Sequence, residues 1–127
     1  ISQRAIDECV KYAKEREVFG KPIKNFEAIS FMIADMEIQT QAARQLALYA
    51  ANLKDNGIVD SLISSASKAF AADTAMKVTV DAVQVLGGYG YSKEYPVEKL
   101  MRDAKIYQIF EGTNQIQRLV VSGNMLH

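Results

Sequence analysis

A single carboxylate, Glu111, stands between an apolar and aromatic run and a polar helix start. Ile109, Phe110 and Gly112 around it suit an apolar cavity, where desolvation raises a carboxyl pKa toward that of a useful base. Thr113 then opens a segment whose backbone amides can bind a phosphate group. On residue types alone, Glu111 also fits an ordinary acidic residue near a helix N-terminus, and for an unfamiliar protein this interpretation is preferred.

Two further segments have the composition of an anion site. Arg16 near the end of an expected helix can simply balance the helix dipole, but Phe19-Gly20 beside it permits the close approach that a guanidinium needs to bind a pyrophosphate. Residues 84–88 read Gln-Val-Leu-Gly-Gly, which is either a helix C-terminus with a flexible turn or a bare backbone that a phosphate or ribityl chain can approach. No Gly-Lys-Ser/Thr ending follows, so this segment is not a P-loop.

The composition predicts one globular domain over residues 1–127. Fifteen Lys and Arg balance fifteen Asp and Glu, so no global basic field attracts nucleic acid or an anionic membrane. No apolar run approaches about 18 residues, so neither a signal peptide nor a membrane span is expected. The chain begins at Ile1, without methionine and inside an apparent helix, which suggests a fragment of a longer polypeptide.

No metal site is predicted. Cys9 is the only cysteine and lies on an apolar helix face, so it fits a small buried hydrophobe in a reducing compartment. The only histidine, His127, is the last residue and has no ligand partner at suitable spacing, so we expect no role for it.

Hydrophobic spacing predicts an all-α fold, an antiparallel four-helix bundle with an additional short helix. The expected elements are a first helix ending near residues 19–22, a second from an Asn25 cap to about 56–57, a third from Asp60 or Ser61 to 87–88, a short helix from Pro96 to about Lys105, and a last helix from Thr113 or Asn114 to about Met125. The apolar stripes are Ile6, Cys9, Val10 and Ala13 on the first helix; Phe26, Ile29, Ile33, Met36, Thr40, Ala43, Ala47 and Ala50 on the second; and Leu62, Ala66, Ala69, Asp73, Met76, Val80 and Val83 on the third.

Asp73 is the one charged residue in the stripe of the third helix. Either the stripe drifts there toward a partly wet edge, or Asp73 is a buried carboxylate with a partner that the sequence does not identify.

Together these segments resemble the C-terminal domain of acyl-CoA dehydrogenases, the flavin enzymes that desaturate fatty acyl thioesters. The motifs are Arg-x-x-Phe-Gly from Arg16, Gln-x-Leu-Gly-Gly from Gln84 and Phe-Glu-Gly-Thr from Phe110, and the resemblance covers nearly the whole chain. It departs from the family at Phe110, which retains an aromatic wall where tyrosine is usual. It also departs at Glu27, where the family usually has a glutamine and where a carboxylate cannot donate a hydrogen bond as an amide does.

The resemblance implies FAD as cofactor and Glu111 as the catalytic base that takes the α-proton of the thioester. Phe110 and Gly112 are implied to line the substrate site. The residues implied to bind FAD are Arg16, Phe19, Gln84, Val85, Leu86, Gly87 and Gly88, across the dimer, and Thr113, Asn114 and Gln115, within the same subunit.

The implied activity is α,β-desaturation of short- or medium-chain acyl-CoA to trans-2-enoyl-CoA, within a full-length enzyme. An electron-transferring flavoprotein and further copies of the chain, in a dimer or tetramer, are the implied partners. The location would be the cytoplasm of a bacterium or the mitochondrial matrix of a eukaryote. The alternatives are an acyl-CoA oxidase-like enzyme and, for the isolated chain, a bundle or assembly module without activity.

Overall fold

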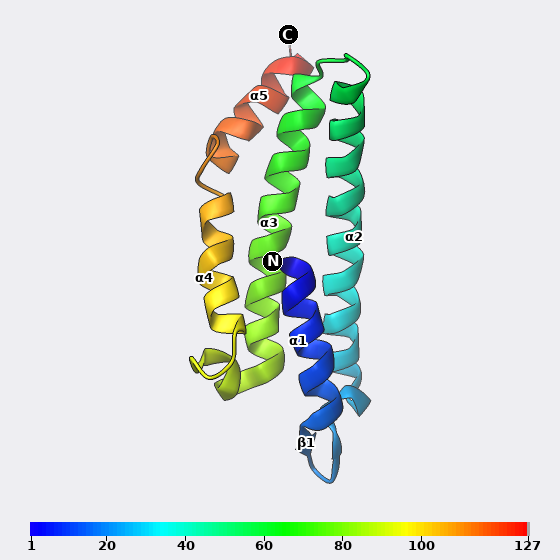
Figure 1. Cartoon of the computed structure of the whole chain (residues 1–127), viewed down its shortest axis with the longest axis vertical. Coiled ribbons are helices and arrows are strands. Elements are labelled where there is room, and N and C mark those ends of the chain that lie inside the picture. Colours follow the sequence, from blue (N-terminus) through cyan, green and yellow to red (C-terminus); the bar gives the residue numbers. More distant parts are fainter. Residues whose placement is uncertain (127) are drawn as a thin grey trace.

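The computed structural model describes residues 1–126 as five α-helices joined by short connections (Figure 1). His127, for which no role is expected, lies outside the described residues. The α-helices are α1 (Ser2–Glu15), α2 (Glu27–Asp55), α3 (Ser61–Leu86), α4 (Val97–Tyr107) and α5 (Asn114–Leu126). The short elements are β1 (Glu17–Val18), β2 (Lys21–Pro22) and the 3-10 helices η1 (Ile23–Asn25) and η2 (Gly87–Tyr91).

The long helices α2 and α3 run side by side, and the other three cover them (Figure 1). The shorter α1 packs against both, while α4 and α5 follow one another along another side of α3. The central helix α3 therefore contacts all four other α-helices. The predicted all-α bundle is confirmed, and one of its walls consists of two helices in tandem.

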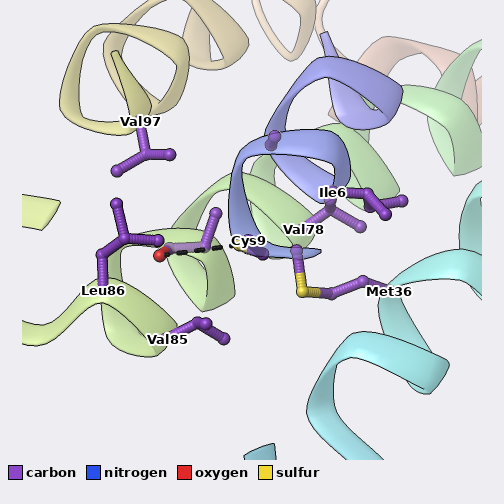
Figure 2. Close-up of a cluster of buried hydrophobic side chains, with 9 residues drawn as sticks. Ile6, Cys9, Met36, Val78, Val85, Leu86 and Val97 are labelled. Atoms are coloured by element: carbon purple, nitrogen blue, oxygen red, sulfur yellow. Dashed lines mark hydrogen bonds between the residues drawn. The ribbon is translucent and has the colours of Figure 1, made fainter. Parts of the chain in front are cut away.

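The core lies where α1, α2, α3 and the start of α4 meet (Figure 2). Its buried members are Ala5, Ile6, Cys9, Met36, Val78, Ala82, Val85, Leu86 and Val97. The Cys9 thiol lies 3.9 Å from the Ala82 carbonyl oxygen, to which it donates a weak hydrogen bond. Burial, aided by the charges of Glu8 and Asp81, raises the pKa of the Cys9 thiol to about 12, so it stays protonated and unreactive. Cys9 is thus the buried hydrophobe that the sequence predicted.

The first helix ends at Glu15, before the predicted end near residues 19–22. The chain instead forms an antiparallel hairpin of β1 and β2, which the sequence did not predict. Phe19 and Gly20 form the turn with φ of 53° and 77°. Two-residue hairpin turns favour positive φ at both positions, and a right-handed helix cannot continue through such residues.

The start of α2 also differs from the prediction. Asn25 is part of η1 and does not cap α2. Phe26 takes the N-cap position of α2 and contributes no side-chain cap hydrogen bond. Met36, Thr40 and Ala43 are buried as predicted, whereas Ala47 is exposed. The first residues of α1 lie partway along α2, so α1 covers only part of that helix (Figure 1). The predicted stripe of α2 continues beyond the part that α1 covers.

Burial along α3 does not follow the predicted stripe. Ala69 is buried, but Val80 is 45% exposed. The buried residues lie on several faces and include many small ones: Ser65, Ser67, Ala69, Ala72, Thr74, Val78, Thr79, Ala82, Val85 and Leu86. One apolar stripe describes a helix with one buried side, and α3 has neighbours on several sides. Small side chains permit this close approach.

The remaining helix ends agree with the sequence to within about two residues. The Asp60 carboxylate accepts a hydrogen bond of 2.8 Å from the Ile63 amide and caps α3 as predicted. Pro96 precedes α4, and the Thr113 hydroxyl oxygen accepts a 3.3 Å hydrogen bond from the Ile116 amide at the start of α5. Within residues 1–126, none of the helices is long and apolar enough to cross a membrane.

Candidate functional site

Glu111 lies in the loop between α4 and α5 with a backbone that non-glycine residues rarely adopt. Its φ is 54°, and the next residue, Gly112, has φ of 86°. Positive φ is unfavourable for a residue with a Cβ and persists only where surrounding contacts impose it. The Gln117 side-chain amide donates a 3.0 Å hydrogen bond to the Glu111 carbonyl oxygen. The loop therefore has a defined shape, held partly from α5.

A mostly apolar groove of about 380 Å³ opens beside Glu111. Its lining residues are Ile1, Ser2, Lys68, Ala71, Ala72, Ala75, Tyr107, Phe110 and Glu111. The rings of Tyr107 and Phe110 meet edge to face with centroids 5.1 Å apart. Phe110 thus lines the same groove as Glu111, and Gly112 follows directly in the loop.

The apolar surroundings expected for Glu111 are only partly present. Its side chain is exposed in this chain, and Ile109 faces a different groove, beside Asp73. Glu111 lines the groove but remains exposed, so desolvation of its carboxylate needs further protein or a bound substrate.

Arg16 lies beside the glycine segment that ends α3. A groove of about 620 Å³ is lined by Arg16 together with Val85, Leu86, Gly87 and Gly88, among other residues. The Arg16 guanidinium lies 5.5 Å from the centroid of the Tyr89 ring, which orients its charge at the edge of the groove. The structure thus brings together two segments that are about seventy residues apart in the sequence.

Two predicted cofactor residues lie outside that groove. Phe19 is 91% exposed at the tip of the hairpin, with its ring centroid 6.4 Å from that of Phe26. Gln84 is also exposed and does not line the groove. In one copy of the chain, both residues are therefore exposed and outside the groove.

The glycines of this segment leave open space. A Cβ at Gly87 or Gly88 would meet no atom within 4 Å, so side chains there would fill the groove and not clash with the fold. Gly87 also needs its φ of 61°, which lets the chain leave α3. An exposed guanidinium beside bare backbone fits the phosphate part of a dinucleotide cofactor such as FAD.

The third predicted segment, Thr113 to Gln115, lies at the junction of α4 and α5, away from the hairpin end that carries Arg16 (Figure 1). The polar groups of Asn114 are engaged within the chain: its side-chain amide donates to Asp73 and Ala69, and its backbone amide donates to Gln108. Gln115 is exposed and Thr113 is half-buried, and both line a groove of about 370 Å³. One copy therefore does not bring the three cofactor segments into one site.

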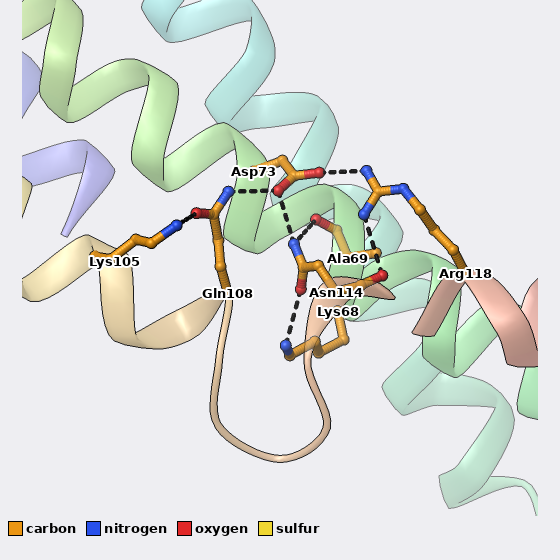
Figure 3. Close-up of polar contacts among 7 residues, drawn as sticks. All are labelled: Lys68, Ala69, Asp73, Lys105, Gln108, Asn114 and Arg118. Carbon is orange, nitrogen blue, oxygen red and sulfur yellow. Dashed lines mark hydrogen bonds and ion pairs between the residues drawn. The ribbon is translucent and has the colours of Figure 1, made fainter. Parts of the chain in front are cut away.

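Asp73 is the centre of a polar cluster that sequence reasoning missed (Figure 3). Its carboxylate accepts hydrogen bonds of 2.6 Å from Gln108, 2.7 Å from Asn114 and 2.6 Å from Arg118. Partial burial alone would raise the pKa of Asp73, but the hydrogen bonds from Arg118, Gln108 and Asn114 outweigh it and hold the pKa below the usual value. Both sequence interpretations are partly right, since Asp73 lies at a wet edge, 37% exposed, and has partners.

Lys68 extends the cluster from one turn earlier on α3. Its Nζ donates hydrogen bonds of 2.8 Å to the Asn114 side-chain oxygen and 2.8 Å to the Gly112 carbonyl oxygen. The only sequence signal was the spacing of Asn114 and Arg118, which places them on one face of α5, toward the acidic residue in the α3 stripe. Within residues 1–126, no group of three His, Cys, Asp or Glu side chains could hold a metal ion.

The described residues thus form an all-α domain in which the loop at Glu111 and the groove of Arg16 and the glycine segment lie apart. Residues 1–126 match the family described as "Acyl-CoA dehydrogenase, C-terminal domain". The chain belongs to this family.

Several of the proteins that the chain resembles are acyl-CoA dehydrogenases. The chain is 50% identical over 126 residues to an acyl-CoA dehydrogenase of Bacillus subtilis, covering 99% of this chain and 33% of that protein. It superimposes on butyryl-CoA dehydrogenase from Megasphaera elsdenii with a TM-score of 0.97 and 48% identity, covering 99% of this chain and 33% of that one. It also matches the FAD complex of PigA with a TM-score of 0.93 and 27% identity, covering 98% and 32%. The chain thus spans about a third of the proteins it matches.

Proposed function

We propose that this chain is the C-terminal domain of an FAD-dependent acyl-CoA dehydrogenase that desaturates short- or medium-chain acyl-CoA. The observation that carries the proposal is Glu111, which lines a mostly apolar groove from a loop of unusual, supported backbone shape. Membership of the family and 48% identity to a butyryl-CoA dehydrogenase support the substrate class.

In the proposed reaction, the Glu111 carboxylate takes the α-proton of the thioester, and its backbone amide helps polarise the thioester carbonyl. FAD, when bound, supplies the acceptor for the β-hydride, so that the carbon-carbon bond becomes a trans double bond. Phe110 forms an aromatic wall on the substrate side. A trans-2-enoyl-CoA is the product, and an electron-transferring flavoprotein is the proposed acceptor of the electrons.

The distribution of the cofactor residues supports a site shared between copies. Arg16 and residues 85–88 would bind the FAD of one subunit, while Thr113 and Gln115 would contact that of another. A dimer or a tetramer is therefore part of the proposal. The remaining flavin and substrate contacts would come from the two thirds of the relatives that this chain does not cover.

The direct test is anaerobic addition of butyryl-CoA to the purified full-length protein, with the flavin absorbance followed near 450 nm and the product identified by mass. Bleaching with formation of a trans-2-enoyl-CoA supports the proposal, and a protein without flavin or without product contradicts it. Oxygen consumption with release of hydrogen peroxide at the rate of turnover would instead favour the acyl-CoA oxidase-like alternative.

Arg16→Ala in the full-length protein is expected to weaken retention of FAD with little change in acyl-chain preference. The guanidinium would lose a charge-assisted contact with the pyrophosphate, which contributes about 1.5–3 kcal/mol. FAD release on dilution, compared with wild type, measures the effect. Arg4→Ala is the matched control, because Arg4 lies on α1, the helix that ends directly before Arg16, and pairs with Glu8 outside the groove. Equal retention by the two variants would refute the assignment.

The 127-residue chain by itself is expected to fold as a helical bundle, to self-associate and to bind FAD weakly or not at all. Its core joins four helices, which supports folding, but the cofactor segments lie in separate places, so one copy offers only part of a site. Sedimentation together with an FAD titration checks both parts. A monomer that binds FAD at submicromolar affinity would show that one copy carries the whole cofactor site.

A further inference from the structure

Side chains from two helices bind the backbone of the loop at Glu111 and Gly112. From α3, Lys68 donates a 2.8 Å hydrogen bond to the Gly112 carbonyl oxygen. From α5, the Gln117 amide donates hydrogen bonds of 3.0 Å to the Glu111 carbonyl oxygen and 3.3 Å to that of Gly112. The carbonyl oxygens of the Glu111–Gly112 and Gly112–Thr113 peptide bonds thus both accept hydrogen bonds from side chains.

These contacts act on an intrinsically unfavourable conformation. Both residues have positive φ, and only Gly112 lacks the Cβ that makes such a backbone unfavourable. A Cβ at Gly112 would lie 2.8 Å from the Gln117 side-chain nitrogen, so that amide would have to move. Side-chain donors at the two carbonyl oxygens stabilise this conformation of the loop.

Lys68 is itself anchored to the rest of the fold (Figure 3). Its Nζ also donates to the Asn114 side-chain oxygen, and Asn114 donates to Asp73 at 2.7 Å. Arg118 pairs with the same carboxylate at 2.6 Å. The lowered pKa of Asp73 keeps that carboxylate charged at neutral pH, so the anchor persists there. The contacts form a continuous path from the loop to the body of α3 and to α5.

We propose that Lys68, anchored through Asn114 to Asp73 and assisted by Gln117, is a positioning residue that holds Glu111 in the orientation required for proton abstraction. The inference rests on the proposed function, because it assigns Lys68 a role toward the proposed base. Lys68 acts through the backbone of the loop and does not itself transfer the proton.

A role of Lys68 in substrate binding can be distinguished from a role in positioning Glu111 by the kinetic constant that its substitution changes. Lys68 also lines the groove beside Glu111, so it could instead bind an anionic group of the substrate. Loss of a substrate contact would raise KM, whereas loss of positioning lowers kcat because substrate still binds but the base is misplaced.

The test compares Lys68→Met with Lys77→Met in the full-length protein. Methionine keeps much of the side-chain length and removes the donor, and Lys77 is a control on the same helix that pairs with Asp81 away from the loop. For Lys68→Met we expect kcat to fall about 10- to 100-fold, as for a base misplaced by about 1 Å, with KM changed less than about threefold. Amide hydrogen exchange over residues 108–114 should be faster in this variant and unchanged in Lys77→Met.

Gln117→Leu provides a second arm if Lys68→Met does not fold, because Gln117 lies near the start of α5 outside the core cluster. We expect the same fall in kcat and faster loop exchange, but smaller, since Lys68 still holds Gly112. A wild-type kcat with unchanged loop exchange in either folded variant overturns the proposal, as does a rise in KM with kcat intact.

The exchange measurement separates failure of this inference from failure of the proposed function. If the wild-type protein does not desaturate any acyl-CoA, the proposed function fails, and loop exchange alone decides whether Lys68 positions Glu111. If the wild type is active and Lys68→Met behaves like Lys77→Met in both measurements, only the positioning role fails.

Discussion

Glu111→Gln in the full-length protein is expected to abolish desaturation while leaving FAD bound. The amide has nearly the shape of the carboxylate and can keep the loop contacts, which involve the backbone carbonyl of Glu111 and not its side chain. It cannot accept the α-proton of the thioester. Loss of a general base typically costs about 10²- to 10⁴-fold in rate, the largest effect expected for any single substitution in this chain.

The measurement is the rate of anaerobic flavin bleaching after mixing with butyryl-CoA, together with the flavin content of the purified variant. Glu98→Gln is the matched control: Glu98 lies on α4, pairs with Arg102 and does not line the groove at Glu111. A Glu111→Gln enzyme that reduces its flavin as fast as wild type would remove Glu111 from the reaction.

Met36→Ala is expected to destabilise the fold by about 2–5 kcal/mol, the range for large-to-alanine substitutions in a core. Met36 is 0% exposed and lies among Ile6, Cys9 and Val78, where α1, α2 and α3 meet (Figure 2). Its loss leaves a cavity that three helices must close, and they can do so only partly. Urea unfolding followed by circular dichroism measures the change.

Met125→Ala is the control for this experiment, because the same side chain is 70% exposed near the end of α5. Its effect should stay within about 0.5 kcal/mol, as for most surface substitutions. If the two methionine variants unfold at the same urea concentration, the position of Met36 in the core is wrong.

Sequence patterns by themselves predicted the helices and identified the family motifs. Three helix ends marked by a specific residue were predicted well, since Asp60 caps α3, Pro96 precedes α4 and Gly87 ends α3, whereas the cap predicted at Asn25 was wrong. Such signals are local, because a cap or a positive φ depends on a few neighbouring residues. The pairing of Arg16 with residues 85–88 came from family motifs, and the structure places them in one groove.

The tertiary structure decided which faces are buried and how the loop at Glu111 is held. Val80 belongs to an apparent stripe and is nonetheless exposed, while Thr79 beside it is fully buried. Several helices pack against α3, so its buried residues lie on several faces and not along a single apolar stripe. The periodicity of apolar residues in the sequence does not show how many neighbours a helix has.

The cluster of Asp73, Lys68 and Arg118 shows most clearly the difference between what the sequence predicted and what the tertiary structure decided. Arg118 is 45 residues from Asp73, and Lys68 contacts a carbonyl 44 residues away. Every residue has a backbone carbonyl, so no residue type in the sequence indicates which carbonyl oxygen accepts a hydrogen bond from a lysine. Residue types made Glu111 one candidate for a base and the resemblance to the family selected it, whereas only the packing of α5 and its preceding loop against α3 decided how the backbone of that loop is held.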